Sequence, residues 1–442
     1  MTDPADLTAH EAARSIRNGE LTSCELVDAC IGRIEAREAD IRAWTYFDAE
    51  QARVQARRLD DARAAGEPLG PLHGVPVGVK DIIATADMPT EDGTPANRGR
   101  QPTEDAFCVR VLREAGAVIM GKTVTTELAT RHPGKTRNPH NLDHTPGGSS
   151  SGSAAAVACG MVPLALGTQT GGSVIRPASF CGIHGLKPTL GMISRTGVTV
   201  QSHTLDTVGV YGRSIEDLAL IAEVLSVADE ADEVSYSRPP ATLGAAASDP
   251  VQSPPRLAFL RTPAWEAASE SARAAILTFV EQLGGRCAEV PAPPSFADII
   301  ERHRCVQYAE NVHHFREIEA RARDLLSPSL QKTLDEARKI PAGDYLDAVR
   351  SRDSTYAELT DLLASYDAVV CLPSAGSAPK GLDWTGDPIF NGLWTYLGVP
   401  AVTLPLLEAD GLPLGLQLVG KRREEGRLLR VAAWVERAAA DR

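Results

Sequence analysis

The sequence lacks the features that mark several classes of protein. Its eight cysteines form no C-x-x-C pair and no spacing with His that suits zinc, so we expect reduced thiols and no bound metal. It holds no run of 18 apolar residues, and its first residues, MTDPADLTAH, show neither a basic nor an apolar signal segment. Lys and Arg are scattered in a chain of formal net charge −13. These absences predict a soluble, cytoplasmic protein with no nucleic-acid or membrane partner.

The composition is that of an ordinary globular protein. Apolar residues make up 43% and charged residues 23% of the 442 positions, which allows a sizeable buried core. Residues 5–65 carry apolar positions at helical spacing, with Thr22 or Ser23 placed as a helix cap. GVPVGVKDII then alternates apolar and small residues, which predicts a strand that ends at Lys80, and AGAVIMGKT predicts a second strand. Mixed helix and strand periods favour one large α/β unit.

The remainder of the chain separates into three kinds of segment. Gly, Ser, Thr and Pro fill residues 135–197 and indicate loops around one helix and one strand, AAAVACGMVPLALGT. Residues 214–226 predict a capped helix, and the Pro-rich residues 227–256 predict a long surface connection. Long helical stretches follow within 264–285 and 298–364, and then the strands DAVVCLPS and PAVTLPLL and a C-terminal helix.

Two short motifs suggest competing functions. Residues 116–123, GAVIMGKT, match a phosphate-binding loop and give a nucleotide binder as an alternative of another class. The four residues between the glycines are themselves strand-like, which argues against a phosphate cradle. GSSSG matches a nucleophile elbow around Ser150, with His203 and Asp206 as partners. Turn formers rather than a strand precede Ser150, and SHTLD is typical of a loop that leads into a strand.

A longer segment carries a stronger signal. Residues 146–189 read PGGSSSGSAAAVACGMVPLALGTQTGGSVIRPASFCGIHGLKPT. The segment resembles the amidase signature family, and GVPVGVKD, LDTVGVYGRSIEDLAL, GVPAVTLPL and GLPLGLQLVG match that family in the expected order. The resemblance implies a central mixed β-sheet sandwiched between helices. It also implies a single domain over 1–442, with a core of about 70–225, a variable helical cap of about 298–364 and a core completed by 365–435.

The resemblance also assigns roles to residues. It implies Ser173 as the nucleophile, Ser149 as a bridging serine and Lys80 as the general base. It places a cis peptide bond between Ser149 and the residue after it. A lysine can act as a base only when it is neutral, and burial after GVPVGV favours the neutral form. Glycines let the turn from Thr170 to Ser173 aim backbone N–H groups at an oxyanion, so the predicted oxyanion hole is Thr170, Gly171, Gly172 and Ser173.

Neighbouring positions have simpler predicted roles, and some depart from the family. We expect Asp81 to bind backbone amides and His184 to be a packed residue rather than a base. The family commonly has T-D-T-G-G-S-I-R where this chain has TQTGGSVIR, so Gln169 replaces an acid and Arg176 stands one place later. Because both ends of a family ion pair change together, we expect rewired support for an intact site. The residues expected to line or cap the acyl pocket are Thr125, His132, Gly147, Gly148, Trp384 and Trp394.

The predicted function is hydrolysis of a small carboxamide-type bond, in an amide, anilide, carbamate or related acyl substrate, through an acyl-enzyme on Ser173. No cofactor is expected, and the resemblance favours a homodimer. The alternative within the family is the glutaminase subunit of a tRNA-dependent amidotransferase, which feeds ammonia to partner subunits. The altered TQTGGSVIR segment and the divergent residues 298–364 place it second.

Overall fold

One mixed β-sheet runs through the protein. The computed structural model describes residues 3–236, 243–249 and 253–440. Its sheet has eleven strands in the order β1-β3-β2-β4-β6-β5-β10-β11-β9-β7-β8, and both parallel and antiparallel pairs occur. The strands are β1 Trp44–Phe47, β2 Pro76–Lys80, β3 Val118–Thr123, β4 Leu164–Gln169, β5 His184–Lys187, β6 Thr207–Gly212, β7 Leu257–Leu260, β8 Cys287–Val290, β9 Ala368–Cys371, β10 Ala401–Ala409 and β11 Leu412–Val419.

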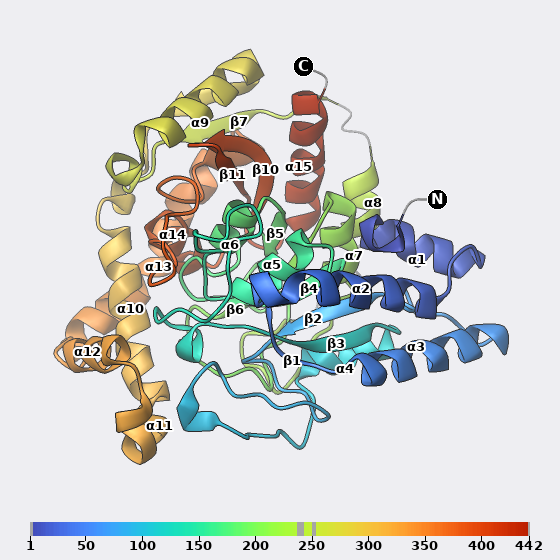
Figure 1. Ribbon diagram of the computed structural model, residues 1–442. Helices are drawn as coiled ribbons and strands as arrows, with labels where there is room; N and C mark the ends of the chain where they lie inside the picture. The colour runs from blue at the N-terminus through green and yellow to red at the C-terminus, as the bar shows by residue number, and fades with distance from the viewer. Residues whose placement is uncertain (1–2, 237–242, 250–252, 441–442) are drawn as a thin grey trace.

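Helices cover both faces of this sheet (Figure 1). They are α1 Ala9–Asn18, α2 Ser23–Ile41, α3 Ala49–Ala64, α4 Phe107–Glu114, α5 Ser151–Ala158, α6 Ile175–Cys181, α7 Ile215–Leu225, α8 Leu243–Ser248, α9 Glu270–Leu283, α10 Ile299–His314, α11 Arg316–Ala322, α12 Pro328–Ala337, α13 Ala342–Leu362, α14 Ile389–Tyr396 and α15 Glu425–Ala440. This architecture confirms the predicted fold class, a central mixed sheet between helices.

Alternation along the strands builds the two apolar layers. In β3, Val118 and Met120 pack with residues of α2 and α5, whereas Ile119 packs with residues of α4 and α7 on the other face. Successive side chains of a strand point to opposite faces, so a strand covered on both sides is mostly apolar. This explains why GVPVGVK and AGAVIMGKT do not alternate with polar residues before the buried Lys80 and Lys122 near their ends.

The strands and helices expected around the signature segment are confirmed. β2 ends at Lys80, α5 and β4 occupy the predicted helix and strand, and α7 begins after Ser214, whose hydroxyl accepts from the N–H of Asp217 at 3.0 Å. Thr22 rather than Ser23 caps α2, and it forms a capping box with Glu25. No helix of the described residues is long and apolar enough to cross a membrane. All eight cysteines are free thiols.

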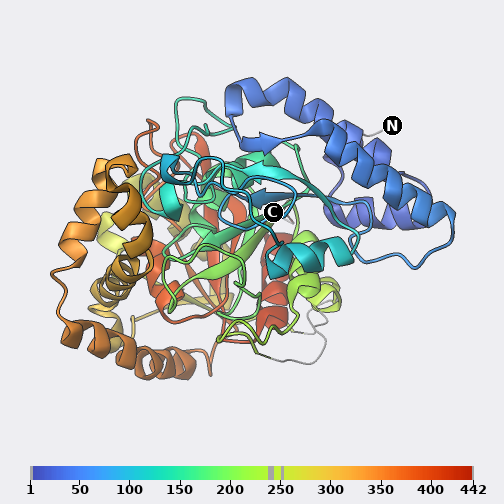
Figure 2. The same ribbon diagram turned by 90° about the horizontal axis from the view of Figure 1, so that it is seen from below.

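Other expectations were too coarse. The segment 5–65 contains β1 as well as three helices, and the predicted connection 227–256 contains α8, with residues 237–242 and 250–252 outside the described part. The stretch 298–364 divides into α10, α11, α12 and α13, which lie at the opposite end of the molecule from the N-terminal helices (Figure 2). A side chain on β1 or α8 is buried only through distant contacts, which a local period does not reveal.

Candidate active site

The ammonium group of Lys80 lies at the centre of the site. β2 delivers it into the interior, where the side chain is 0% exposed. Lys80 Nζ donates to Ser149 Oγ and to Thr168 Oγ1, each at 2.7 Å. Burial lowers the pKa of Lys80 well below its usual value, and the charge of Asp206 opposes this only in part. A strand of Val and Gly residues thus places a lysine where its neutral form is favoured.

Ser149 is held through its own backbone. The cis peptide bond lies between Gly148 and Ser149, so the expectation that it follows Ser149 was wrong. The carbonyl of Gly148 accepts from Arg176 Nη2 at 2.7 Å, and the carbonyl of Ser149 accepts from Thr126 N at 3.1 Å. Protein donors therefore hold the peptide units on both sides of the Ser149 Cα, which orients the hydroxyl toward Lys80.

The turn from Thr170 to Ser173 has an uneven hydrogen-bond pattern. Its four carbonyls are all occupied: in order along the chain, by His303 Nε2, Thr395 Oγ1, Arg176 N and Tyr211 Oη. The N–H groups of Gly171, Gly172 and Ser173 meet no acceptor among the described residues. Fixed carbonyls and free amides are what a backbone anion site requires, because the donors stay available while the turn stays rigid.

The hydroxyl of Ser173 is the exposed member of this group. In the part of the chain that the structure describes, no hydrogen bond reaches Ser173 Oγ, and the residue is half-buried at the wall of a cavity. Ser149, by contrast, is 2% exposed. The structure therefore brings Lys80 and Ser149 into direct contact and presents Ser173 to the cavity, without a hydrogen bond between the two serines.

Asp206 supports the turn through Thr170. Its Oδ1 accepts from Thr170 Oγ1 at 2.5 Å, and its Oδ2 accepts from the N–H groups of Gln201 and Ser202. Burial raises the pKa of Asp206. Sequence reasoning read SHTLD only as a loop before a strand, which β6 confirms, and missed this support. The signal was a lone acid directly before an apolar strand.

The two departures from the family pattern serve different partners. Gln169 Oε1 accepts from the N–H groups of Val174 and Ile175 at 2.9 and 3.0 Å and so caps the start of α6. Arg176 donates through Nε to the carbonyl of Thr385 at 2.8 Å and through Nη2 to Gly148. Each side chain therefore supports the site through separate backbone groups. Gln169 and Arg176 do not bond to each other, so they do not replace the family ion pair with another pair.

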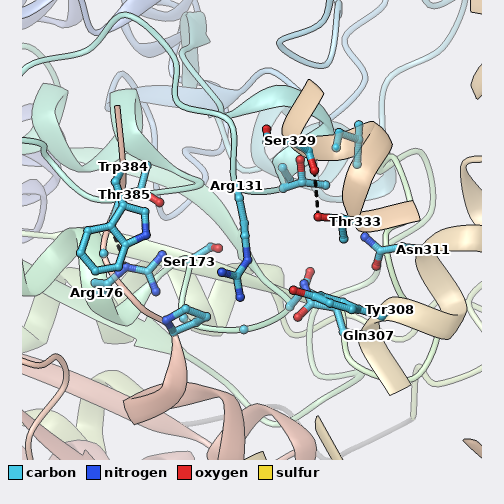
Figure 3. Close-up of a pocket in the computed structure, with 18 residues that line it drawn as sticks. Arg131, Ser173, Arg176, Gln307, Tyr308, Asn311, Ser329, Thr333, Trp384 and Thr385 are labelled. Atoms are coloured by element: carbon cyan, nitrogen blue, oxygen red, sulfur yellow. Dashed lines mark hydrogen bonds between the residues drawn. The ribbon is translucent and has the colours of Figure 1, made fainter. Parts of the chain in front are cut away.

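The cavity beside Ser173 has two kinds of wall (Figure 3). One comes from the turn 170–173, Arg176 and the segment 384–388, and the other from α10 and α12. Arg131 reaches into the space between them, from a loop that precedes Ser149 in the chain. The sequence analysis expected Trp384 and the helical cap 298–364 here, but it did not name Arg131 or the individual side chains of the second wall. Those residues are Arg131, Gln307, Tyr308, Asn311, Ser329, Leu330 and Thr333.

Several residues predicted for the pocket lie elsewhere. Trp394 is 0% exposed in the core, where its ring packs edge-on against Phe296. Thr125 is buried and donates to the carbonyl of Thr126, and His132 is exposed outside the cavity wall. Gly147 and Gly148 lie behind the wall, where a Cβ on Gly147 would approach Pro177 Cα to 3.0 Å. An apolar aromatic in a helix such as α14 favours the core, and this outweighs its position near the site.

The competing motifs do not form their sites. Residues 118–123 are strand β3, and Lys122 is buried with its ammonium donating to the carbonyl of Ile83 and to Thr90 Oγ1, so the nucleotide-binding alternative is wrong. Ser150 Oγ donates to the carbonyl of Thr168, while His203 is exposed. Asp81 accepts from the N–H of Glu91, and His184 contacts Glu436, as expected of supporting residues. No cluster of His, Cys, Asp or Glu in the described ranges could hold a metal ion.

Comparisons with known proteins show the family of this chain. The sequence model of the Amidase family matches residues 25–429. Two curated relatives, each named as the A subunit of glutamyl-tRNA(Gln) amidotransferase, are 34% identical to this chain. The one from Chloroflexus aggregans matches over 98% of this chain and 96% of its own, and the one from Bacillus licheniformis over 97% and 96%.

Solved structures share the whole fold. The native peptide amidase of Stenotrophomonas maltophilia is 30% identical, with a TM-score of 0.86 over 99% of this chain and 97% of its own. A chain from a vestigial protein complex that revealed the evolutionary origins of an s-triazine catabolic enzyme is 28% identical, with a TM-score of 0.91 over 98% of both chains.

Fold, site and relatives together define an enzyme that acts on carbon–nitrogen amide bonds, either a hydrolase or an amidotransferase component. The chain belongs to the Amidase family, as its signature segment predicted. The curated relatives back the alternative of a glutaminase subunit better than the free amidase that the sequence analysis ranked first.

Proposed function

We propose that this chain cleaves the C–N bond of a carboxamide through an acyl-enzyme on Ser173. The observation that carries the proposal is the buried contact of Lys80 with Ser149 beside a turn whose amides are free. A serine hydroxyl needs a base, and a lysine whose pKa is lowered by burial supplies one without a metal or a histidine.

The proposed proton path runs through Ser149. Neutral Lys80 accepts the Ser149 proton while it still donates to Thr168, and Ser149 Oγ in turn accepts the proton of Ser173. Ser173 Oγ attacks the carbonyl carbon, and the N–H groups of Gly171, Gly172 and Ser173 bind the oxyanion. The path then reverses and protonates the leaving nitrogen, so an amine or ammonia departs and an ester remains on Ser173. Water, deprotonated by the same path, hydrolyses that ester.

Glutamine is the first carboxamide to consider. The curated relatives that match nearly the whole chain are named as A subunits of a glutamyl-tRNA(Gln) amidotransferase. In this reading, the side-chain amide of glutamine acylates Ser173 and ammonia passes to partner subunits. Those relatives match nearly the whole chain, which supports the glutaminase reading against the expectation that residues 298–364 diverge from such subunits.

The second candidate is a free amidase that acts on a small amide, carbamate or related acyl substrate and forms a homodimer. The peptide amidase with the same fold at 30% identity supports it, as does the rewired segment around Gln169 and Arg176. Residues 1–442 would then act as one catalytic domain.

Ammonia release separates these candidates from one another and from inactivity. The purified chain, alone and with amidotransferase partner subunits, is incubated with glutamine and with a panel of small amides. Glutaminase activity that rises with the partners supports the glutaminase reading. Activity on small amides alone supports the free enzyme. Equal rates for wild type and Ser173→Ala on every substrate contradict the proposed chemistry.

A further inference from the structure

Helix α10 holds the first residue of the turn that carries Ser173. His303 is buried, and its Nε2 lies 2.8 Å from the carbonyl oxygen of Thr170. Burial lowers the pKa of His303 to about 4, so at neutral pH the ring is uncharged and has a single N–H. Because a carbonyl oxygen can only accept, that N–H is on Nε2 and donates to Thr170.

This hydrogen bond sets the direction of a backbone donor. The carbonyl of Thr170 and the N–H of Gly171 belong to one peptide unit, which is trans. The two groups of a planar trans peptide point in opposite directions, so the side chain that holds the carbonyl also orients the N–H. Without His303, the peptide unit could rotate, and the Gly171 N–H would lose its fixed direction.

The ring of His303 is itself confined. A Cβ built on Gly392 of α14 would lie 2.9 Å from His303 Nδ1, and a Cβ built on Gly171 would lie 3.7 Å from His303 Cε1. The ring therefore fills the space between α14 and the turn. Glycine at position 392 leaves the room that this orientation of the ring requires.

A second buried side chain of α10 holds the segment 201–206. Glu310 accepts from four uncharged donors, Ser202 Oγ, Thr204 N, Thr204 Oγ1 and Tyr345 Oη. A carboxylate that accepts several hydrogen bonds in the interior fixes its donors more firmly than a neutral group does. Glu310 therefore ties this segment to α10 and, through Tyr345, to α13.

The segment 201–206 carries this restraint to Thr170. Asp206 Oδ2 accepts from the N–H of Ser202 at 3.0 Å, and Asp206 Oδ1 accepts from Thr170 Oγ1 at 2.5 Å. Helix α10 thus fixes the carbonyl of Thr170 directly through His303, and it fixes the hydroxyl of Thr170 indirectly through Glu310.

We propose that His303 and Glu310 are positioning residues through which α10 orients the Gly171 N–H toward the oxyanion. The inference rests on the proposed acyl-enzyme chemistry and adds to it two side chains that do not touch the reacting atoms. Gln307 and Tyr308 of the same helix line the cavity (Figure 3). The helix that meets the substrate therefore also aligns a donor for its transition state.

Labelling of Ser173 by a small fluorophosphonate tests the proposal, because negative charge develops on the phosphoryl oxygen beside the turn. Labelling rates at several probe concentrations, followed by intact mass, give the maximal rate and the concentration for half of it. His303→Leu should lower the maximal rate by about 10- to 100-fold and leave the half-maximal concentration nearly unchanged. His303→Gln, whose amide can donate to the same carbonyl, should stay within about threefold of wild type.

Two variants on the same helix test the indirect path. Glu310→Gln keeps the size of the side chain but removes its charge and places donors against donors, so the maximal rate should fall by about tenfold. Glu301→Gln, an exposed change on α10, should leave the rate unchanged. Equal maximal rates in wild type and His303→Leu overturn the proposal. A loss that is the same in His303→Leu and His303→Gln also overturns it, because a purely structural role does not depend on the donor.

A spectroscopic measurement separates this inference from the proposed function. In protein with ¹⁵N-labelled histidine, the ring signals that are lost in His303→Gln belong to His303. A neutral ring protonated on Nε2, with signals that shift in Glu310→Gln but not in Glu301→Gln, supports the inference even if Ser173 is never labelled. In that case only the proposed function fails. A ring with its only proton on Nδ1 overturns the inference, because Nε2 could not donate to Thr170.

Discussion

The two walls of the cavity differ in how they are built. In the wall around Ser173, the carbonyls are bonded, Arg176 is buried and the supporting contacts come from β4, β6, α6, α14 and His303 of α10. In the wall of α10 and α12, Gln307 and Tyr308 are half-buried and Ser329 is exposed. A rigid wall fixes the geometry of bond breaking, whereas a partly exposed helical wall can vary with the substrate. The predictions below test this division, in order of decreasing effect.

The largest effect should come from the nucleophile. We expect Ser173→Ala to lower kcat by about 10³-fold or more, since the acyl-enzyme cannot form. Steady-state ammonia release measures it. Ser354→Ala, an exposed serine on α13, is the matched control and should retain wild-type rates. A rate close to wild type in Ser173→Ala would show that Ser173 is not the nucleophile.

The next effect should come from the base and should depend on pH. Because the reaction needs neutral Lys80, kcat/KM of wild type should rise with pH until the lysine is deprotonated, and Lys80→Met should lose about 10³-fold with no such rise. A pH-rate profile from about 6 to 10 checks this. A rise of the same midpoint that persists in Lys80→Met would assign it to another group.

Lys80 should also make the free energy of unfolding depend on pH. Its folded pKa lies below the unfolded value of about 10.4, so the unfolded chain binds the proton more tightly. The free energy of unfolding should therefore rise with pH between the folded and the unfolded pKa of Lys80. Below the folded pKa, the folded state bears the full cost of burying the charged lysine. Denaturant unfolding of wild type and Lys80→Met gives the difference, which removes the contributions of buried Lys122 and Lys187. A difference in the free energy of unfolding that does not change with pH would show that burial does not lower the pKa of Lys80.

Gly172→Ala should have an intermediate effect. The added Cβ would lie 2.3 Å from Asn391 Oδ1 and 2.7 Å from Arg176 Nη1, so the turn and the free amides must shift. Since losing one oxyanion donor typically costs about 10²-fold in kcat, we expect a loss of that order. Gly343→Ala, at a position with open space around it, is the control. If Gly172→Ala unfolds at the same temperature as wild type, the lost activity comes from catalysis and not from a less stable fold.

The smallest effect should come from the helical wall. Tyr308→Ala should raise KM by about three- to tenfold with kcat nearly unchanged, because the Tyr308 side chain contributes binding that is equal in the ground and transition states. Initial rates over a range of substrate concentrations separate the two constants. A fall in kcat as large as that of Gly172→Ala would erase the distinction between the walls.

The sequence predicted the first wall far better than the second. Lys80 at the end of a Val-rich strand and serines in a Gly-rich turn are short-range patterns with direct chemical meaning. For the second wall, the family resemblance indicated only that residues 298–364 cap the site. Tyr308 and Ser329 lie far along the chain from Ser173, and no local period shows which side chains of that segment reach the cavity. Trp394 shows the same limit in reverse, because its apolar ring satisfied the core rather than the cavity. The shifted Arg176 was visible as a departure, but the unpaired Nη1 of its side chain was not.

The most direct test of the account is covalent labelling of the nucleophile. Wild type, Ser173→Ala and Lys80→Ala are treated with a small fluorophosphonate, and the adducts are measured by intact mass and peptide mapping. We expect one adduct on Ser173 in wild type, none in Ser173→Ala and slower labelling in Lys80→Ala. An adduct on Ser150, or equal labelling of wild type and Ser173→Ala, would contradict it.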